Sequence, residues 1–201
     1  MSGSFPTSPK FSALQFSSTN PSLINQSLSG KRQVRQIGSQ YFSFTVAMPP
    51  MKYDDSMTVF AFLTKQKGSY ETFTIQYPTD NRGAGKSETD ILVNGSHSAS
   101  DGTIAVDGFA ASTSGVLKAG DLIKFANHSK VYMVQADCDS DGTGATTVLI
   151  EPSLVTTLAD NEAVTVNKPS FTVYLTSSDI LFSTDAQGFY SINFDVREVI
   201  T

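Results

Sequence analysis

The sequence contains no tryptophan, a single cysteine, Cys138, and only two histidines, His97 and His128. One thiol can neither form a disulfide within the chain nor build a zinc site, so stability must come from packing or from assembly. Both histidines lie in turn-like segments rich in Ser and Asn with no nucleophile motif nearby, which indicates exposed loop residues. We therefore expect no catalytic residues, and a protein that is not an enzyme.

Charged residues are scarce, and their balance is acidic, with a formal net charge of −5. A protein that neutralises phosphates needs a basic surface, so we expect no sequence-specific binding to nucleic acid. Lys31, Arg32 and Arg35 form one basic group, which is typical of a solvated arm or an interface rim. No apolar stretch approaches the length of a membrane span, so no membrane partner is expected. The N-terminal residues do not resemble a signal peptide, which predicts synthesis in a cytoplasm.

The polar remainder is rich in Ser, Thr, Gly and Asn, which favour turns and strands over helices. Residues 41–48 and 190–197 alternate apolar and polar side chains at the two-residue period of half-buried strands. One helix is predicted, with N-cap candidates in Asp54-Asp55-Ser56 and with Gly68 as the C′ residue. The composition and these patterns predict a mainly β protein.

The first 40 residues scatter apolar side chains among Pro6, Pro9 and Pro21, which are too many breakers for a long element. Those side chains must nevertheless be covered. The segment can pack on the chain's own sheet, or it can add a strand to a neighbouring subunit. The sequence leaves both alternatives open.

A polar, glycine-containing break at residues 79–90 separates two styles of sequence. Short strand-like pieces spaced by turns follow it, and clean alternating strands return after Pro169. We therefore predict an antiparallel β-sandwich from residues 1–78 and 170–201, which forms rings and carries an N-terminal arm. A small β-barrel-like module, residues 89–167, is inserted into it.

Two motifs suggest binding sites, but neither is complete. Gly83-Ala84-Gly85-Lys86-Ser87 lacks the first glycine of a phosphate-binding loop, because Asp80 stands there, and we interpret it as a flexible loop between modules. Residues 137–142, DCDSDG, match the first half of a calcium loop, but Val148 replaces the bidentate glutamate. We interpret that segment as a hairpin turn whose Asp residues bond their own backbone.

These motifs predict no catalytic, cofactor-binding or metal site, and no cofactor. Weak calcium binding at Asp137, Asp139 and Asp141 stays open.

Two parts of the chain resemble virion proteins of tailed bacteriophages. The first part resembles tail-tip proteins. It consists of residues 38–51 (GSQYFSFTVAMPPM), the helix that ends in Phe62-Leu63, and the start of the following strand at residues 68–73 (GSYETF). The second part resembles β-modules found in phage virion proteins. It consists of residues 117–123 (LKAGDLI), 132–134 (YMV), 137–142 and Glu151-Pro152.

Within that class the order of elements resembles the belt domain of the distal tail protein family. The resemblance implies a virion protein, assembled in the host bacterial cytoplasm, that forms a homohexameric ring in the baseplate region of the tail. The ring would be an adaptor between the tail tube and the tail-tip hub. The familiar layout often adds a carbohydrate-binding-like module after the belt domain, whereas the extra module here lies inside it.

Two alternatives remain at this stage. A tail-tube, tail-completion or head–tail connector subunit would share the sandwich and the ring. A carbohydrate-binding module for host attachment would instead expose aromatic side chains such as Phe109, Phe125 or Tyr132 to a sugar, although tryptophan is absent.

Overall fold

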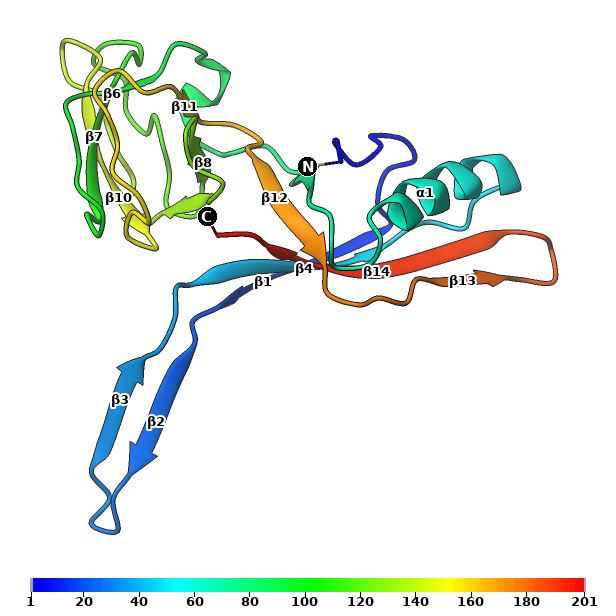
Figure 1. Ribbon diagram of the computed structural model, residues 1–201. Coiled ribbons are helices and arrows are strands. Elements are labelled where there is room, and N and C mark those ends of the chain that lie inside the picture. The colour runs from blue at the N-terminus through cyan, green and yellow to red at the C-terminus, as the bar shows by residue number, and fades with distance from the viewer. Residues whose placement is uncertain (1, 201) are drawn as a thin grey trace. The chain divides into compact units, whose positions relative to one another are not determined.

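A computed structural model describes residues 2–200, which form mainly antiparallel strands and one α-helix, α1 (Tyr53–Lys65) (Figure 1). The predicted mainly β class with one short helix is confirmed. The chain divides into two compact units. The outer unit comprises the residues up to Thr74 together with Thr172–Val199, and the inner unit comprises Ile75–Phe171 and Ile200. The boundaries fall within two strands of the outer sheet, so a few residues of those strands are counted with the inner unit.

The outer unit is built on one sheet with the strand order β1-β4-β14-β12-β5, and β13 pairs with β14 beyond the end of β12. Its strands are β1 (Ala13–Thr19), β4 (Tyr41–Ala47), β5 (Phe73–Gln76), β12 (Ser170–Leu175), β13 (Leu181–Thr184) and β14 (Tyr190–Glu198). Phe42, Phe44 and Val46 of β4 are buried while the residues between them are more exposed, as the two-residue period predicted.

Helix α1 buries Ser56, Val59 and Leu63. It begins earlier than predicted, because Lys52 is the N-cap residue and contributes no side-chain hydrogen bond. Asp54 and Asp55 lie inside the first turn, where their charges interact favourably with the helix dipole instead of capping it.

The end of the helix also differs from the prediction by one residue. Gln66 is the C-cap, so Lys67 rather than Gly68 follows it directly. Both residues have positive φ angles, 55° and 65°, so the chain leaves the helix through two left-handed residues.

The N-terminal residues contain only short strands, as predicted, and one of them belongs to the outer sheet. Phe5 is buried, and its ring contacts those of Phe11, Phe62, Phe73 and Phe194. In β1, which is an edge strand paired with β4, Phe16 stacks on Phe42 and Phe44. Pro6, Pro9 and Pro21 do not disrupt β1, because all three prolines lie outside that strand. Packing on the chain's own sheet therefore holds for residues 2–19.

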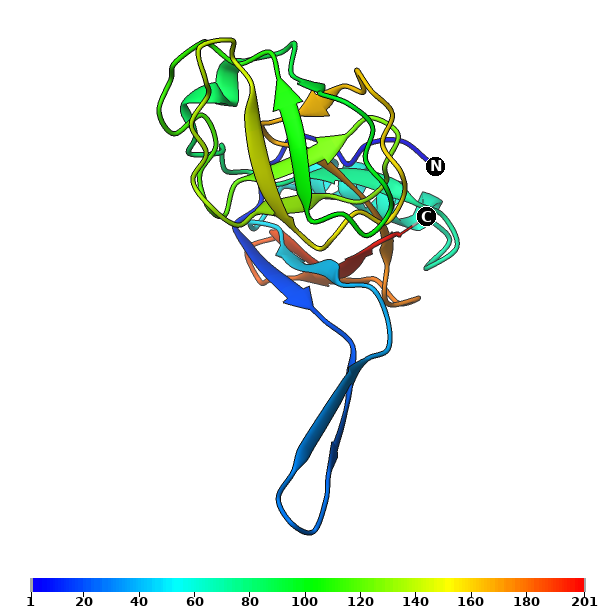
Figure 2. The ribbon, with the colours of Figure 1, turned by 90° about the vertical axis from the view of Figure 1, so that its left-hand side faces the viewer.

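Residues 21–37, hereafter the arm, form a β-hairpin that belongs to neither main sheet. Its strands β2 (Ser22–Gln26) and β3 (Arg32–Gln36) pair only with each other. The hairpin extends away from the end of the β1–β4 pair (Figures 1 and 2). Every residue of both strands is exposed.

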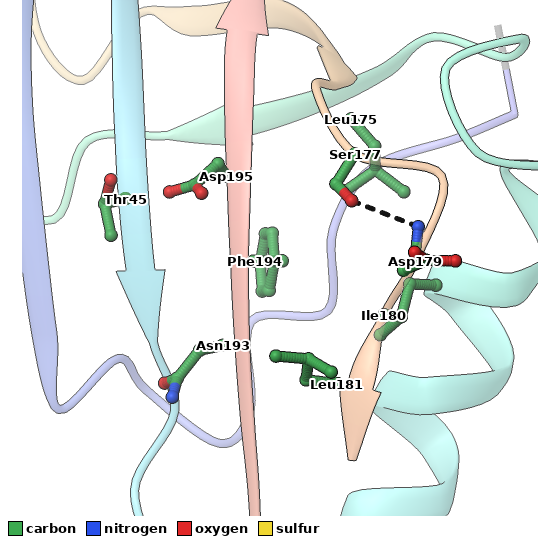
Figure 3. A pocket seen from close by; sticks show the side chains of 9 residues that line it. All are labelled: Thr45, Leu175, Ser177, Asp179, Ile180, Leu181, Asn193, Phe194 and Asp195. Atoms are coloured by element: carbon green, nitrogen blue, oxygen red, sulfur yellow. Dashed lines mark hydrogen bonds between the residues drawn. The ribbon is translucent and has the colours of Figure 1, made fainter.

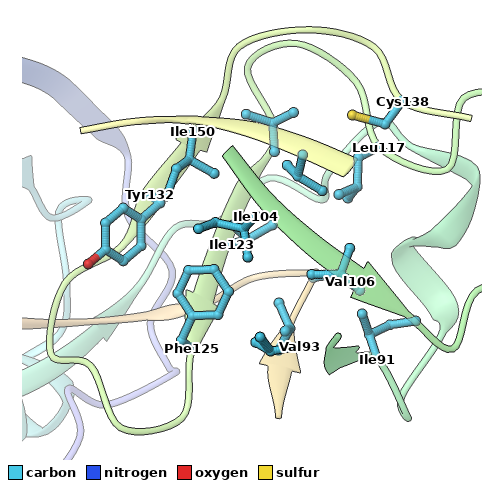
Figure 4. Close-up of a cluster of buried hydrophobic side chains, with 14 of the residues drawn as sticks. Ile91, Val93, Ile104, Val106, Leu117, Ile123, Phe125, Tyr132, Cys138 and Ile150 are labelled. Carbon is cyan, nitrogen blue, oxygen red and sulfur yellow. The ribbon is translucent and has the colours of Figure 1, made fainter. Parts of the chain in front are cut away.

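The inner unit has a six-stranded sheet with the order β11-β8-β9-β10-β7-β6. Its strands are β6 (Leu92–Val93), β7 (Thr103–Asp107), β8 (Leu122–Phe125), β9 (Tyr132–Val134), β10 (Thr146–Glu151) and β11 (Val164–Thr165). A bridge between Leu92 and Ala163 brings the two ends of the sheet together. The nearly closed sheet, which confirms the barrel-like prediction, surrounds the aliphatic and aromatic core shown in Figure 4.

Within residues 2–200, we find no helix with the length and hydropathy needed to span a membrane.

Candidate functional site

The glycine-containing segment at residues 83–87 is a packed corner of the inner unit rather than a flexible loop. It forms a short 3₁₀ helix, η1 (Ala84–Ser87). The N–H groups of Ala84 and Gly85 donate to the carbonyls of Gly115 and Val116, at 2.8 and 3.0 Å. A Cβ at Gly83 would overlap the carbonyl oxygen of Val116, so this position needs glycine for close packing. The amides that would bind a phosphate are therefore already used.

Asp121 explains how this corner is held. It is 2% exposed, and its carboxylate accepts hydrogen bonds from the N–H groups of Arg82, Gly83 and Lys118 at 2.7 to 2.9 Å. A buried carboxylate that accepts several amide hydrogen bonds stabilises a turn, because the amide groups lose their hydrogen bonds to water on folding and need a partner in the protein. The role of Asp121 in the inner unit is thus structural.

The three aspartates of the calcium-like segment serve different turns. Asp137 and Asp139 accept the N–H groups of Ala119 and Gly115, at 2.9 and 2.6 Å, and these hydrogen bonds lower the pKa of both carboxyl groups. For Asp141 the Thr143 hydroxyl is the main cause of a lowered pKa.

Only Asp141 bonds within its own turn, so the interpretation of this segment is right for Asp141 and wrong for the other two. No cluster of potential metal ligands occurs among residues 2–200.

We expect that calcium is not required for the stability of the inner unit, because these carboxylates already have protein hydrogen-bond donors. Excess chelator should leave the melting temperature unchanged in differential scanning calorimetry. A fall in melting temperature that calcium restores and magnesium does not would contradict this prediction. The variant Asp139→Asn, which keeps an acceptor for Gly115, tests whether any such fall comes from this carboxylate.

The two histidines are not the exposed loop residues that the sequence suggested. His128 is 5% exposed, its Nδ1 lies 2.7 Å from the Tyr132 hydroxyl, and burial lowers its pKa. His97 is mostly buried, and its Nε2 accepts the N–H of Ala105 at 3.2 Å. Both rings therefore hold local structure. The Cys138 thiol is also buried, and burial raises its pKa, which makes it a poor nucleophile.

The aromatic side chains proposed for sugar stacking are not on the surface. Phe109 is 5% exposed, and Phe125 and Tyr132 are fully buried in the core of the inner unit (Figure 4). Sugar binding by these residues is excluded, because a stacking platform must present its face to the solvent.

The arm presents apolar side chains on both of its faces. Cross-strand partners share a face, so Ile24 and Val34 lie on one face and Leu23 lies on the other. These three side chains are between 53% and 60% exposed, and Leu28 at the tip is completely exposed. A two-stranded hairpin that buries neither face is marginally stable in water. The arm is therefore the surface that most needs a partner.

Positive and negative charges are unevenly distributed along the chain. Residues 1–53 contain Lys10, Lys31, Arg32, Arg35 and Lys52, and all 19 acidic residues follow residue 53. Three of these cations lie on the arm. Within residues 2–200, the structure shows no hydrogen bond or ion pair to the Arg32 and Arg35 side chains. Sequence reasoning noticed the basic group but missed the hairpin that displays it.

Two comparisons with known proteins agree with this architecture. Residues 81–169, which lie within the inner unit, match the family model described as the distal tail protein pb9, B domain. Across 211 aligned residues the chain is 26% identical to the distal tail protein pb9 of Escherichia phage T5, with 96% of each chain covered. The chain resembles the distal tail protein family over nearly its whole length, and its inner unit resembles the B domain of pb9.

Proposed function

We propose that this protein is a structural component of a bacteriophage tail, where it forms a homohexameric ring between the tail tube and the tail tip. Its partners are other copies of itself and the neighbouring tail proteins. The observation that carries the proposal is the arm, which exposes apolar side chains on both faces and is covered by no element among residues 2–200. The similarity to a distal tail protein over 96% of the chain supports the same role.

The unpaired edge of the outer sheet favours assembly of several copies of this chain. Residues 2–5 run along β5, with a bridge between Ser4 and Thr74, so this edge of the outer sheet is covered. The opposite edge, β1, pairs only with β4. A ring covers such edges in every subunit, which protects them from uncontrolled pairing.

A tail-tube, tail-completion or head–tail connector subunit is the second candidate, because it would use the same edges and arm. The position of the protein in a reconstruction of the particle distinguishes these roles. Attachment to host sugars is disfavoured, since the aromatic side chains considered for it are buried. An enzymatic role is also disfavoured, because both histidines and the cysteine are engaged in local structure.

Mass measurement in solution combined with negative-stain imaging tests the proposal. We expect a species of six times the 21.6 kDa chain mass, which appears as a ring with a central channel. A protein that stays monomeric at every accessible concentration, and in the particle, would refute ring formation. A ring with another number of subunits would favour the second candidate.

A further inference from the structure

The outer unit contains a pocket that the proposed function does not yet use. Its volume is about 370 Å³, and it lies where the chain loops out between β12 and β13 beside β14. The apolar part of the lining comes from Leu175, Ile180, Leu181 and Phe194. Leu175 and Phe194 are buried, whereas Leu181 is 76% exposed and Ile180 is half-buried, so the apolar lining that is open to solvent comes from Ile180 and Leu181.

Two exposed carboxylates belong to the lining of the pocket, and Asp195 projects from the face of β14 opposite to the buried Phe194 ring. Asp195 projects from β14 and Asp179 from the loop, on opposite sides of Phe194 in the view of Figure 3. Within residues 2–200, the structure shows no hydrogen bond or ion pair to either carboxylate, and the pocket lining includes no basic side chain. The pocket therefore combines exposed apolar surface with two carboxylates that have no cationic partner.

The tip of the arm has the complementary character. Leu28 is completely exposed at the turn, where the N–H of Gly30 donates to the carbonyl of Ser27. Lys31 and Arg32 follow within the next four residues. The tip thus combines one aliphatic side chain with two cations, and opposite charges around an apolar anchor are typical of specific protein interfaces.

The arm of a chain cannot fill the pocket of the same chain. The arm starts at the end of β4 marked by Tyr41, which pairs with Thr19 of β1. The pocket lies toward the other end of β4, at Thr45, opposite Asp195. From its root the arm leads away from β13 and from the segment that joins β12 to β13 (Figure 1). The residues from Pro21 to Leu28 span about 26 Å in extended conformation, which is long enough to reach a neighbouring molecule.

From this geometry we infer that the arm tip of one copy docks in the Asp179–Asp195 pocket of the next copy. The inference rests on the proposed ring and specifies how its subunits are joined. Arm and pocket are different surfaces, so the contact is head-to-tail, and a repeated head-to-tail contact closes into a ring when the rotation permits. Leu28 contacts Ile180 and the exposed Leu181, and Lys31 and Arg32 pair with the two carboxylates.

Charge reversal on each side, and then on both, tests the contact. The arm variant is Lys31→Glu/Arg32→Glu, and the pocket variant is Asp179→Lys/Asp195→Lys. Because the four side chains are exposed, each variant should fold normally. Each should weaken ring assembly about tenfold or more in sedimentation velocity, as the loss of close interfacial charge pairs does elsewhere. The four-residue combination, which restores opposite charges in every contact, should recover ring assembly.

A matched control separates this contact from an effect of net charge. Lys10→Glu/Lys52→Glu makes the same charge change at two exposed positions outside the arm and should assemble like the unaltered chain. Rings in the unaltered chain and in both reversed variants would overturn the docking inference while leaving the proposed ring intact. So would failure of the combined variant to recover rings. Absence of rings from the unaltered chain would refute the proposed function itself.

Discussion

Replacing the arm, residues 21–37, with a short Gly/Ser linker should give a folded monomer that no longer forms rings. The arm buries none of its strand residues in its own chain, so its removal should change the free energy of unfolding by less than about 0.5 kcal/mol. Thr19 and Tyr41 are paired across β1 and β4, so a short turn can connect them. Circular dichroism and thermal melting measure the fold, and sedimentation velocity measures the loss of rings.

Deletion of residues 2–30 is not an equivalent change. It removes Phe5 from the core of the outer unit and all of β1 from the sheet, so the truncated chain should be unstable as well as monomeric. A suitable control shortens the β13–β14 turn at Ala186–Gly188, which leaves the arm in place and should preserve rings. Rings of normal stability in the chain without its arm would contradict both the assembly role of the arm and the docking inference.

Gly144→Ala should strongly destabilise the inner unit. Gly144 has a φ of +84°, and a Cβ at this position would overlap the carbonyl oxygen of Phe109. The same two residues are joined by a hydrogen bond from the N–H of Phe109 to the carbonyl of Gly144, at 3.1 Å. The substitution combines a left-handed conformation with a backbone collision, so we expect a loss of about 3 kcal/mol or more. Urea denaturation followed by tyrosine fluorescence measures it.

Gly142→Ala is the matched control, since a Cβ at Gly142 has no heavy atom within 4 Å. Gly142 lies two residues before Gly144 in the same turn, and its replacement should alter the free energy of unfolding by less than about 0.5 kcal/mol. Equal stability of the Gly144 and Gly142 variants would show that the turn adjusts freely and that the close approach to Phe109 is not required.

Strands with one buried face could be predicted from the sequence, because burial of one face makes apolar and polar residues alternate. Phe42, Phe44 and Val46 alternate because one face of β4 is covered, and Ile192, Phe194 and Val196 of β14 alternate for the same reason. The arm has no covered face, so its residues show no such alternation and the hairpin was missed. The pocket of the outer unit was missed too, because Asp179 and Asp195 come together with Leu175 only through the pairing of β12 and β13 along β14.

Composition and local patterns were sufficient to predict the mainly β class, the single helix, the polar break before the inner unit and the resemblance to phage tail proteins. These properties follow from composition and from local periods, which each segment carries alone. The folded chain was needed to show that Phe5 belongs to the outer core, that Asp137 and Asp139 bond a distant turn, and that the arm strands pair only with each other within residues 2–200. Each of these depends on which remote segment approaches a residue, and burial and hydrogen-bond partners are settled by that approach rather than by the neighbours in the chain.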